Sequence, residues 1–141
     1  MGEERRKSPS PPRTRSIEVG HLLPEANVAG LYVGGQPLPD EIVAELHVEA
    51  GPGVGTSVAV TRPVTVLGRG AAYADVEIGD ESTSRRHAFI AYREGGFSLA
   101  DMGSTNGTKL NGKLVGEATL TSGDRIQIGA SVLRFAVSKR R

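Results

Sequence analysis

The residues best suited to chemistry fall in three short stretches that are rich in glycine, hydroxyl and basic side chains. They are Gly68-Arg69-Gly70, Ser82-Thr83-Ser84-Arg85-Arg86-His87 and Gly103-Ser104-Thr105-Asn106-Gly107-Thr108. Guanidinium groups supply positive charge and several N–H donors, and hydroxyls supply further donors at short range. A phosphate monoester is close to a dianion at neutral pH and has three strong acceptor oxygens. The three stretches together therefore have the chemistry of a phosphate-binding site.

Individual residues in these stretches suit different tasks. Those predicted to contact phosphate are Arg69, Ser84, Arg85 and Thr105. Asn106 both donates and accepts through its amide, which suits it to hold the backbone of a peptide beside the phosphate. For these groups to act together, the three stretches must be loops at one end of a rigid scaffold.

Most of the chain after residue 40 consists of short runs in which apolar residues alternate with polar ones, separated by turn formers. This pattern predicts β-strands. The predicted strands are 43–49, 57–61, 64–67, 75–78, 88–92, 97–100, 108–110, 114–115, 125–128 and 132–137. Asn111-Gly112 predicts a type I′ turn, because both residues tolerate positive φ. Ten or eleven short strands, and no convincing helix after residue 40, favour an all-β fold, an antiparallel β-sandwich.

Length and composition narrow the class of protein. A chain of 141 residues has room for one domain and a tail. The formal net charge is only +1, which argues against a general nucleic-acid binder. The absence of cysteine excludes disulfides and cysteine-based zinc sites. No apolar run is long enough for a signal peptide or a membrane span, so we expect a cytoplasmic protein without a membrane partner.

The proline distribution divides the chain into segments. Six of the eight prolines lie in the first 40 residues, which also carry basic clusters. So many fixed φ angles and missing donors do not suit a central sheet. We expect residues 1–40 to be a disordered tail and linker, residues 41–138 to be the domain, and residues 139–141 to be a basic end.

The order and spacing of these motifs resemble the forkhead-associated (FHA) domain. The resemblance is carried by Gly68-Arg69, by Ser84-Arg85-Arg86-His87, by Ser104-Thr105-Asn106-Gly107-Thr108, and by Leu110-Asn111-Gly112 and Gly123-Asp124 further on. It covers roughly residues 42–138. It implies an eleven-stranded β-sandwich that recognises phosphothreonine in a partner protein, without catalysis and without a cofactor.

The resemblance also implies roles for single residues. Arg69 matches an arginine that contacts the phosphate or supports the peptide, and Ser84 matches the phosphate-binding serine. Arg85 falls where a further basic or polar phosphate contact is placed. Thr105 corresponds to a threonine that reaches the phosphate, and Asn106 to an asparagine that fixes the main chain of the peptide. Positions that shape the loops are Gly68, His87 and Gly107, and these are expected to give structural support.

Other functions fit the residues less well. Ser84 and His87 could be combined with Asp101 as a hydrolase triad, but a serine three residues before its histidine in one loop is not an arrangement that known triads share. Gly51-Pro52-Gly53-Val54-Gly55 lacks the lysine of a phosphate-binding P-loop and predicts a hairpin turn instead. The three histidines have no metal-ligand spacing, so we expect no metal site.

Two alternatives concern regulation and partners. Thr14 lies among arginines, and Ile17 follows three residues later, so phosphorylated Thr14 could dock into the loops of its own chain or of a second copy. The expected partners are phosphothreonine proteins marked by a Ser/Thr kinase. A phosphate-independent scaffold or oligomerisation adaptor with the same fold is the main competing function.

Overall fold

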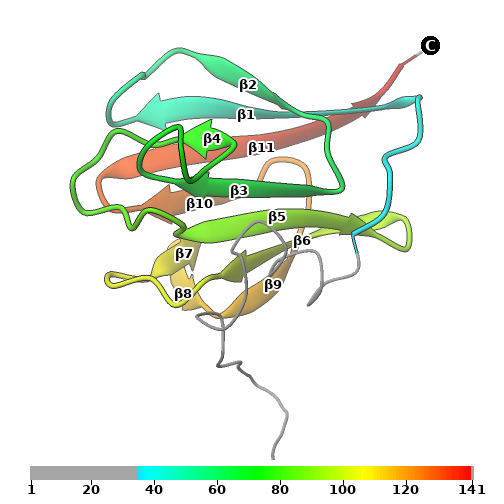
Figure 1. Cartoon of the computed structure of the whole chain (residues 1–141). Helices are drawn as coiled ribbons and strands as arrows, with labels where there is room; N and C mark the ends of the chain where they lie inside the picture. The colour runs from blue at the N-terminus through cyan, green and yellow to red at the C-terminus, as the bar shows by residue number, and fades with distance from the viewer. Residues whose placement is uncertain (1–34, 141) are drawn as a thin grey trace, which may run out of the picture. The chain divides into compact units, whose positions relative to one another are not determined.

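A computed structural model describes residues 35–140 of the chain (Figure 1). These residues form eleven strands and no helix. The strands are β1 (Ile42–Ala50), β2 (Ser57–Val60), β3 (Val64–Gly68), β4 (Val76–Glu77), β5 (Ala88–Arg93), β6 (Gly96–Asp101), β7 (Thr108–Leu110), β8 (Lys113–Val115), β9 (Glu117–Leu120), β10 (Arg125–Ile128) and β11 (Ser131–Lys139). The all-β prediction is confirmed.

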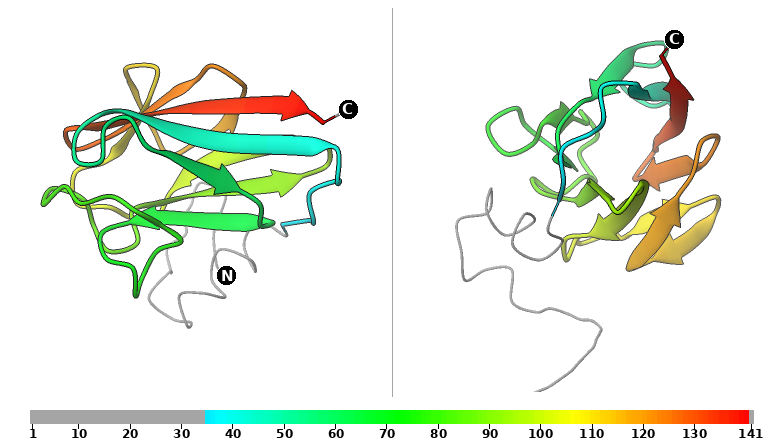
Figure 2. Two further views of the ribbon diagram at one scale, coloured as in Figure 1. Left: turned by 90° about the horizontal axis from the view of Figure 1, so that it is seen from above. Right: turned by 90° about the vertical axis from the view of Figure 1, so that its right-hand side faces the viewer.

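The strands form two sheets that pack as a sandwich. One sheet has six strands in the order β2-β1-β11-β10-β7-β8, and the other has five in the order β4-β3-β5-β6-β9. Figure 2 shows the β1–β11 pair and the β3–β5 pair on opposite sides of the sandwich. The longest pairing is that of β1 with β11, which runs from Ile42↔Lys139 to Ala50↔Val132.

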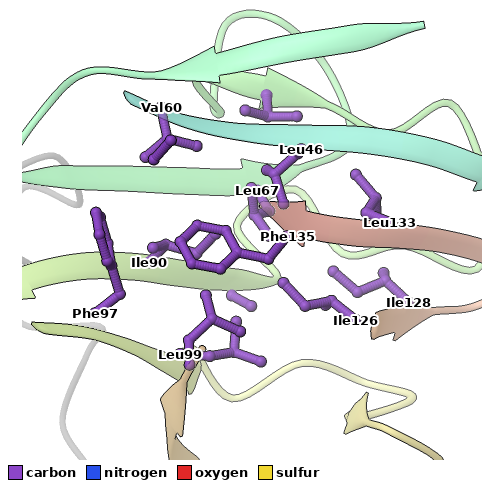
Figure 3. Close-up of a cluster of buried hydrophobic side chains, with 14 of the residues drawn as sticks. Leu46, Val60, Leu67, Ile90, Phe97, Leu99, Ile126, Ile128, Leu133 and Phe135 are labelled. Carbon is purple, nitrogen blue, oxygen red and sulfur yellow. The ribbon is translucent and has the colours of Figure 1, made fainter. Parts of the chain in front are cut away.

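The core lies between the two sheets and is built from the inward-facing residues of both. Figure 3 labels eight core residues that have at most 1% of their surface exposed: Leu46, Leu67, Ile90, Leu99, Ile126, Ile128, Leu133 and Phe135. The ring of Phe135 also packs edge-on against that of Phe97, with centroids 5.1 Å apart. Burial on this scale is the main source of stability for the scaffold that carries the loops.

Two features of the sheets differ from the sequence prediction. The sandwich is not purely antiparallel, because β3 and β4 run parallel, with Leu67 opposite Val76 and Gly68 opposite Glu77. Strand β9 was not predicted, because the run Glu117-Ala118-Thr119-Leu120 is only four residues long and holds only two apolar residues, of which Leu120 alone is buried. Pairing with β6 makes this segment a strand.

The turns follow local sequence. Asn111 and Gly112 have φ angles of 52° and 87°, and they join β7 to β8 as the predicted two-residue turn. Glu94 and Gly95 do the same between β5 and β6, with φ angles of 56° and 82°. Residues 51–56 form the predicted hairpin connection between β1 and β2.

The described part of the chain begins at the end of the sandwich where β5 finishes (Figure 1). There the backbone N–H of Gln36 donates to Tyr92 O at 2.8 Å, and its side-chain oxygen accepts from the N–H of Glu94 at 2.7 Å. The expected tail over residues 1–40 lies mostly outside the described residues, as does Thr14. In residues 35–140 no helix is long and apolar enough to cross a membrane, and no three His, Asp or Glu side chains cluster as metal ligands would.

Candidate phosphopeptide-binding site

Three connections gather at the opposite end of the sandwich, where β3 and β6 finish and β5 begins, on the left in Figure 1. We call them the three site loops. They are the β3–β4 loop (69–75), the β4–β5 loop (78–87) and the β6–β7 loop (102–107). All eight site residues predicted within residues 35–140 lie in these loops or, for Gly68, at the end of the adjoining strand.

Gly68 and Arg69 join the first two loops. A Cβ atom placed on Gly68 would lie only 1.8 Å from the carbonyl oxygen of Arg85, so no larger residue fits without a shift of backbone. The backbone N–H of Arg69 donates to Ser84 O at 3.0 Å, and its Nε–H donates to Thr83 O at 2.9 Å. The terminal nitrogens of Arg69 have no hydrogen-bond partner within residues 35–140, so this exposed guanidinium keeps donors for a ligand.

Ser84 and Thr105 join the second loop to the third. The backbone N–H of Thr105 donates to Ser84 Oγ at 3.1 Å. The hydroxyl of Ser84 therefore receives a hydrogen bond on one side and retains its own proton as a donor. Since Ser84 is half-buried and Thr105 is exposed, the two residues form part of the surface at this end of the sandwich.

His87 lies beneath the loops, fully buried, and it is hydrogen-bonded through both ring nitrogens. The N–H of Ser84 donates to His87 Nδ1 at 3.0 Å, and Nε2 lies 2.7 Å from Gly107 O. Because Nδ1 accepts, the ring proton must be on Nε2, which then donates to the carbonyl of Gly107. One imidazole thus connects the second loop to the third. Gly107 has a φ of 87°, a conformation that favours glycine.

This hydrogen bonding does not form the catalytic pair considered for Ser84 and His87. The hydroxyl of Ser84 is bonded to Thr105 rather than to the imidazole, and both ring nitrogens have backbone partners. A general base must lie within hydrogen-bond reach of the proton that it removes. The geometry of His87 is that of a group that holds two loops together.

Asn106 is exposed, and its side chain bridges two of the site loops. Its Nδ2 donates to Ser82 O at 2.8 Å, while no group in the described part of the chain donates to its Oδ1. The amide therefore has one donor engaged and an acceptor available. A peptide lying across the loops could use that acceptor.

Sequence reasoning missed Asp101 as the organiser of the β6–β7 loop. Its carboxylate accepts from Ser104 N at 2.9 Å, from Ser104 Oγ at 2.6 Å and from Thr108 Oγ1 at 2.7 Å. Ser104 Oγ in turn accepts from the N–H of Gly107 at 2.9 Å. The spacing Asp-x-x-Ser is a signal that could have been recognised, because such side chains bond backbone groups a few residues later in turns.

Asp80 has a similar role in the β4–β5 loop. It accepts from the hydroxyl and the N–H of Ser82, at 2.6 and 2.9 Å, and from the N–H of Ala130 in the β10–β11 turn. These hydrogen bonds, that from the Ser82 hydroxyl above all, hold the pKa of Asp80 below its ordinary value. Gly129 fits beneath this contact, since a Cβ there would lie 2.1 Å from Ser82 Oγ.

Arg85 lies on the outside of the β4–β5 loop and faces an aromatic ring. Its guanidinium carbon lies 5.0 Å from the centroid of the Tyr73 ring, and that of Arg86 lies 5.2 Å from the same centroid. Tyr73 is exposed and belongs to the β3–β4 loop. Together with Arg69, these residues give the end of the sandwich a concentration of positive charge suited to an anion.

The sequence of this chain is similar to that of known proteins. The sequence model of the FHA domain matches residues 65–129. The chain is 36% identical over 130 residues to the oxoglutarate dehydrogenase inhibitor of Corynebacterium diphtheriae, covering 90% of each chain. It is 37% identical over 110 residues to the glycogen accumulation regulator GarA of Mycolicibacterium smegmatis, covering 78% of this chain and 68% of that one.

Solved structures give the same assignment. An FHA domain whose interactions were studied as phosphothreonine-dependent is 32% identical, with a TM-score of 0.61 over 67% of this chain and 95% of that one. The FHA domain of FhaA, solved in complex with the intracellular domain of Rv3910, is 33% identical, with a TM-score of 0.59 over 65% of this chain and 98% of that one. The chain belongs to the FHA domain family.

Proposed function

We propose that this protein binds phosphothreonine-containing partner proteins through the three site loops and acts without catalysis in Ser/Thr kinase signalling in the cytoplasm. The observation that carries the proposal is the joining of Arg69, Ser84 and Thr105 across three separate loops. Two of these residues retain free donors at the surface, and the guanidinium of Arg85 adds charge beside them. A phosphate dianion needs this combination of charge and short donors.

In the proposed complex the phosphate is bound by Arg69, Ser84, Arg85 and Thr105, and the peptide backbone is held by Asn106. The close approach of Gly68 to Arg85 and the hydrogen bonds of His87 already join the loops to one another, and Asp101 fixes the β6–β7 loop, so little order has to be gained when the ligand binds. Such preorganisation raises affinity because fewer groups lose conformational freedom on binding.

Substitution of Arg69 tests the proposal. Loss of a charge-assisted hydrogen bond costs about 1.5–3 kcal/mol, so Arg69→Ala is expected to weaken phosphothreonine peptide binding by about tenfold or more. The control is Arg93→Ala, which removes the same charge from an exposed position at the far end of β5. Calorimetric titration with peptides chosen from a phosphothreonine library measures both variants. Equal affinities for wild type and Arg69→Ala would refute the role of Arg69.

The tail gives this proposal a regulatory extension, in which phosphorylated Thr14 occupies the site loops of its own chain or of a second copy. About 20 residues separate Thr14 from Gly35, and an extended chain of that length reaches up to about 70 Å. That reach exceeds the length of a six-residue strand such as β5, which is about 20 Å. Amide spectra of the site loops that stay unchanged after complete phosphorylation of Thr14 would rule the extension out.

A second candidate function is favoured by the similarity to proteins named oxoglutarate dehydrogenase inhibitors, one of which is covered over 90% of its length. In this candidate the unphosphorylated partner is an oxoglutarate dehydrogenase, and the same fold binds it without phosphate. Assays of a purified oxoglutarate dehydrogenase with and without the protein, before and after phosphatase treatment of the enzyme, separate the two functions. Inhibition that survives phosphatase treatment supports the second candidate.

A further inference from the structure

Tyr73 is an aromatic residue in a loop that is otherwise made of small and charged side chains. It stands in the sequence Gly70-Ala71-Ala72-Tyr73-Ala74, and 37% of its surface is exposed. Its ring faces the guanidinium groups of both Arg85 and Arg86, with centroid distances of 5.0 and 5.2 Å. A guanidinium within about 6 Å of a ring centroid is attracted by the negative face of the ring.

The position of the ring is fixed by the loop that carries it. The N–H of Tyr73 donates to Gly70 O at 3.0 Å, which closes a turn. Gly70 has a φ of 102°, and a Cβ built on it would lie 3.4 Å from the Tyr73 ring, so the ring stands over this turn with room for no more than a methyl group between them. The loop ends at Asp75, whose carboxylate accepts from Val66 N and from the guanidinium of Arg62, each at 2.8 Å. Tyr73 therefore stands on a loop that is anchored to β3.

Arg85 has a fixed backbone and an exposed side chain. Its carbonyl oxygen lies against Gly68, where a Cβ would come within 1.8 Å, so the backbone has little room to move. Its guanidinium makes no hydrogen bond or ion pair with any of residues 35–140, and its contact with Tyr73 is what holds it. A long side chain that is free in solution loses up to about 2 kcal/mol of rotamer entropy when it is ordered by a ligand.

An aromatic ring and a carboxylate would restrict the guanidinium of Arg85 with different consequences for phosphate binding. A carboxylate would accept the N–H groups of the guanidinium and neutralise its charge, and it would then compete with phosphate for both. The face of an aromatic ring attracts the charge but leaves N–H donors for another acceptor. The contact between Tyr73 and Arg85 therefore restricts the arginine and keeps it available.

We propose that Tyr73 is a positioning residue that orders the guanidinium of Arg85 for the phosphate of the ligand. This inference rests on the proposed function. Tyr73 acts through Arg85, so its contribution depends on the arginine and on the ring, and not on the tyrosine hydroxyl.

The test uses the full chain and N-acetyl-O-phosphothreonine N-methylamide, which carries the phosphate and one residue but no flanking side chains. Affinity is measured by NMR titration for wild type, Tyr73→Leu, Tyr73→Phe, Arg85→Ala and the double variant Tyr73→Leu/Arg85→Ala. We expect Tyr73→Leu to weaken binding by about two- to fivefold, the usual strength of one exposed cation–π contact. Tyr73→Phe, which keeps the ring, should bind as wild type does.

Two further readouts distinguish positioning from a merely structural role. In the Arg85→Ala background, Tyr73→Leu should have no further effect on affinity, as a double-mutant cycle requires for coupled residues. The Nε–H signal of Arg85 should show a ring-current shift in wild type and Tyr73→Phe that disappears in Tyr73→Leu.

Different results would overturn different claims. If wild type fails to bind the probe, the proposed function falls and this inference falls with it. If wild type binds but Tyr73→Leu binds equally well, only the inference is overturned. It is also overturned if the effect of Tyr73→Leu persists in the Arg85→Ala background, because the ring would then act through another group such as the guanidinium of Arg86.

Discussion

The backbone N–H of Thr105 donates a 3.1 Å hydrogen bond to the side-chain oxygen of Ser84, 21 residues earlier in the chain. This contact brings the β4–β5 loop and the β6–β7 loop together in one surface. Beneath it, His87 bonds the N–H of Ser84 and the carbonyl of Gly107, so the same two loops are joined a second time. The surface that we propose to bind phosphothreonine is therefore built by contacts between loops.

The first prediction concerns the close approach of Gly68 to Arg85. Gly68→Ala should force the Arg85 backbone away and cost about 1–3 kcal/mol of stability, as overpacking usually does. Phosphothreonine peptide binding should fall by about tenfold or more, because the displaced loop carries charge-assisted contacts. Urea denaturation and calorimetric titration measure the two effects.

Gly96→Ala is the matched control. Gly96 has no positive φ, and a Cβ built on it meets nothing within 4 Å. The free energy of unfolding of Gly96→Ala should differ from that of wild type by no more than about 0.5 kcal/mol. Equal stability and equal peptide affinity of Gly68→Ala and Gly96→Ala would contradict the steric role of Gly68.

The second prediction concerns His87. His87→Ala removes a fully buried ring and leaves Ser84 N and Gly107 O without their partner. We expect a loss of about 2–5 kcal/mol in the free energy of unfolding, from the cavity and the unsatisfied polar groups. His47→Ala, at a partly exposed position on β1, should cost less than about 1 kcal/mol. Urea denaturation curves for both variants give the two free energies of unfolding. Similar losses in His87→Ala and His47→Ala would contradict the proposal that His87 holds two loops together.

The third prediction concerns Asp101, which accepts three hydrogen bonds in the β6–β7 loop. Asp101→Asn replaces one acceptor oxygen with an NH₂ group, so the donors of Ser104 and Thr108 cannot all be satisfied. The free energy of unfolding should fall by about 1–3 kcal/mol. Hydrogen exchange at the amides of residues 104 and 107 should become faster, while Asp40→Asn at an exposed position should leave both unchanged. Slow exchange that persists in Asp101→Asn would show that the loop does not need this carboxylate.

The fourth prediction concerns pH. Hydrogen bonds from the hydroxyl and N–H of Ser82, and from the N–H of Ala130, lower the pKa of Asp80 from its ordinary value of 3.8. A carboxyl with a depressed pKa in the folded state contributes stability above its unfolded pKa and loses it as the pH falls through the folded value. The stability difference between wild type and Asp80→Asn should thus be constant from pH 7 to about 5 and should shrink below about pH 4. Urea midpoints measured at several pH values test this, and a difference that does not vary with pH would contradict it.

The parts of the fold that sequence predicts are those determined by local patterns. Apolar alternation indicated ten of the strands, and Asn111-Gly112 indicated its turn because positive φ at both positions is a local property. Strand β9 was missed because its residues become a strand only by pairing with β6. The parallel run of β4 beside β3 is likewise set by how the β3–β4 loop folds back through Asp75.

The same distinction applies to the site. Residue types and spacing placed Arg69, Ser84 and Thr105 in candidate loops, and the FHA resemblance gave them roles. Sequence did not indicate that Asp80 reaches Ala130, 50 residues away, or that Tyr73 faces Arg85. These contacts depend on how loops meet in the folded chain, which no local pattern encodes.

Titration of the wild-type chain with paired peptides tests whether the site loops recognise phosphothreonine. Each pair shares one sequence chosen from a phosphothreonine library, and its members carry either phosphothreonine or threonine at the central position. The loss of a phosphate removes several charge-assisted hydrogen bonds, so we expect the threonine member to bind at least about tenfold more weakly. Equal affinity for the two members of every pair would contradict the claim that these loops recognise phosphothreonine.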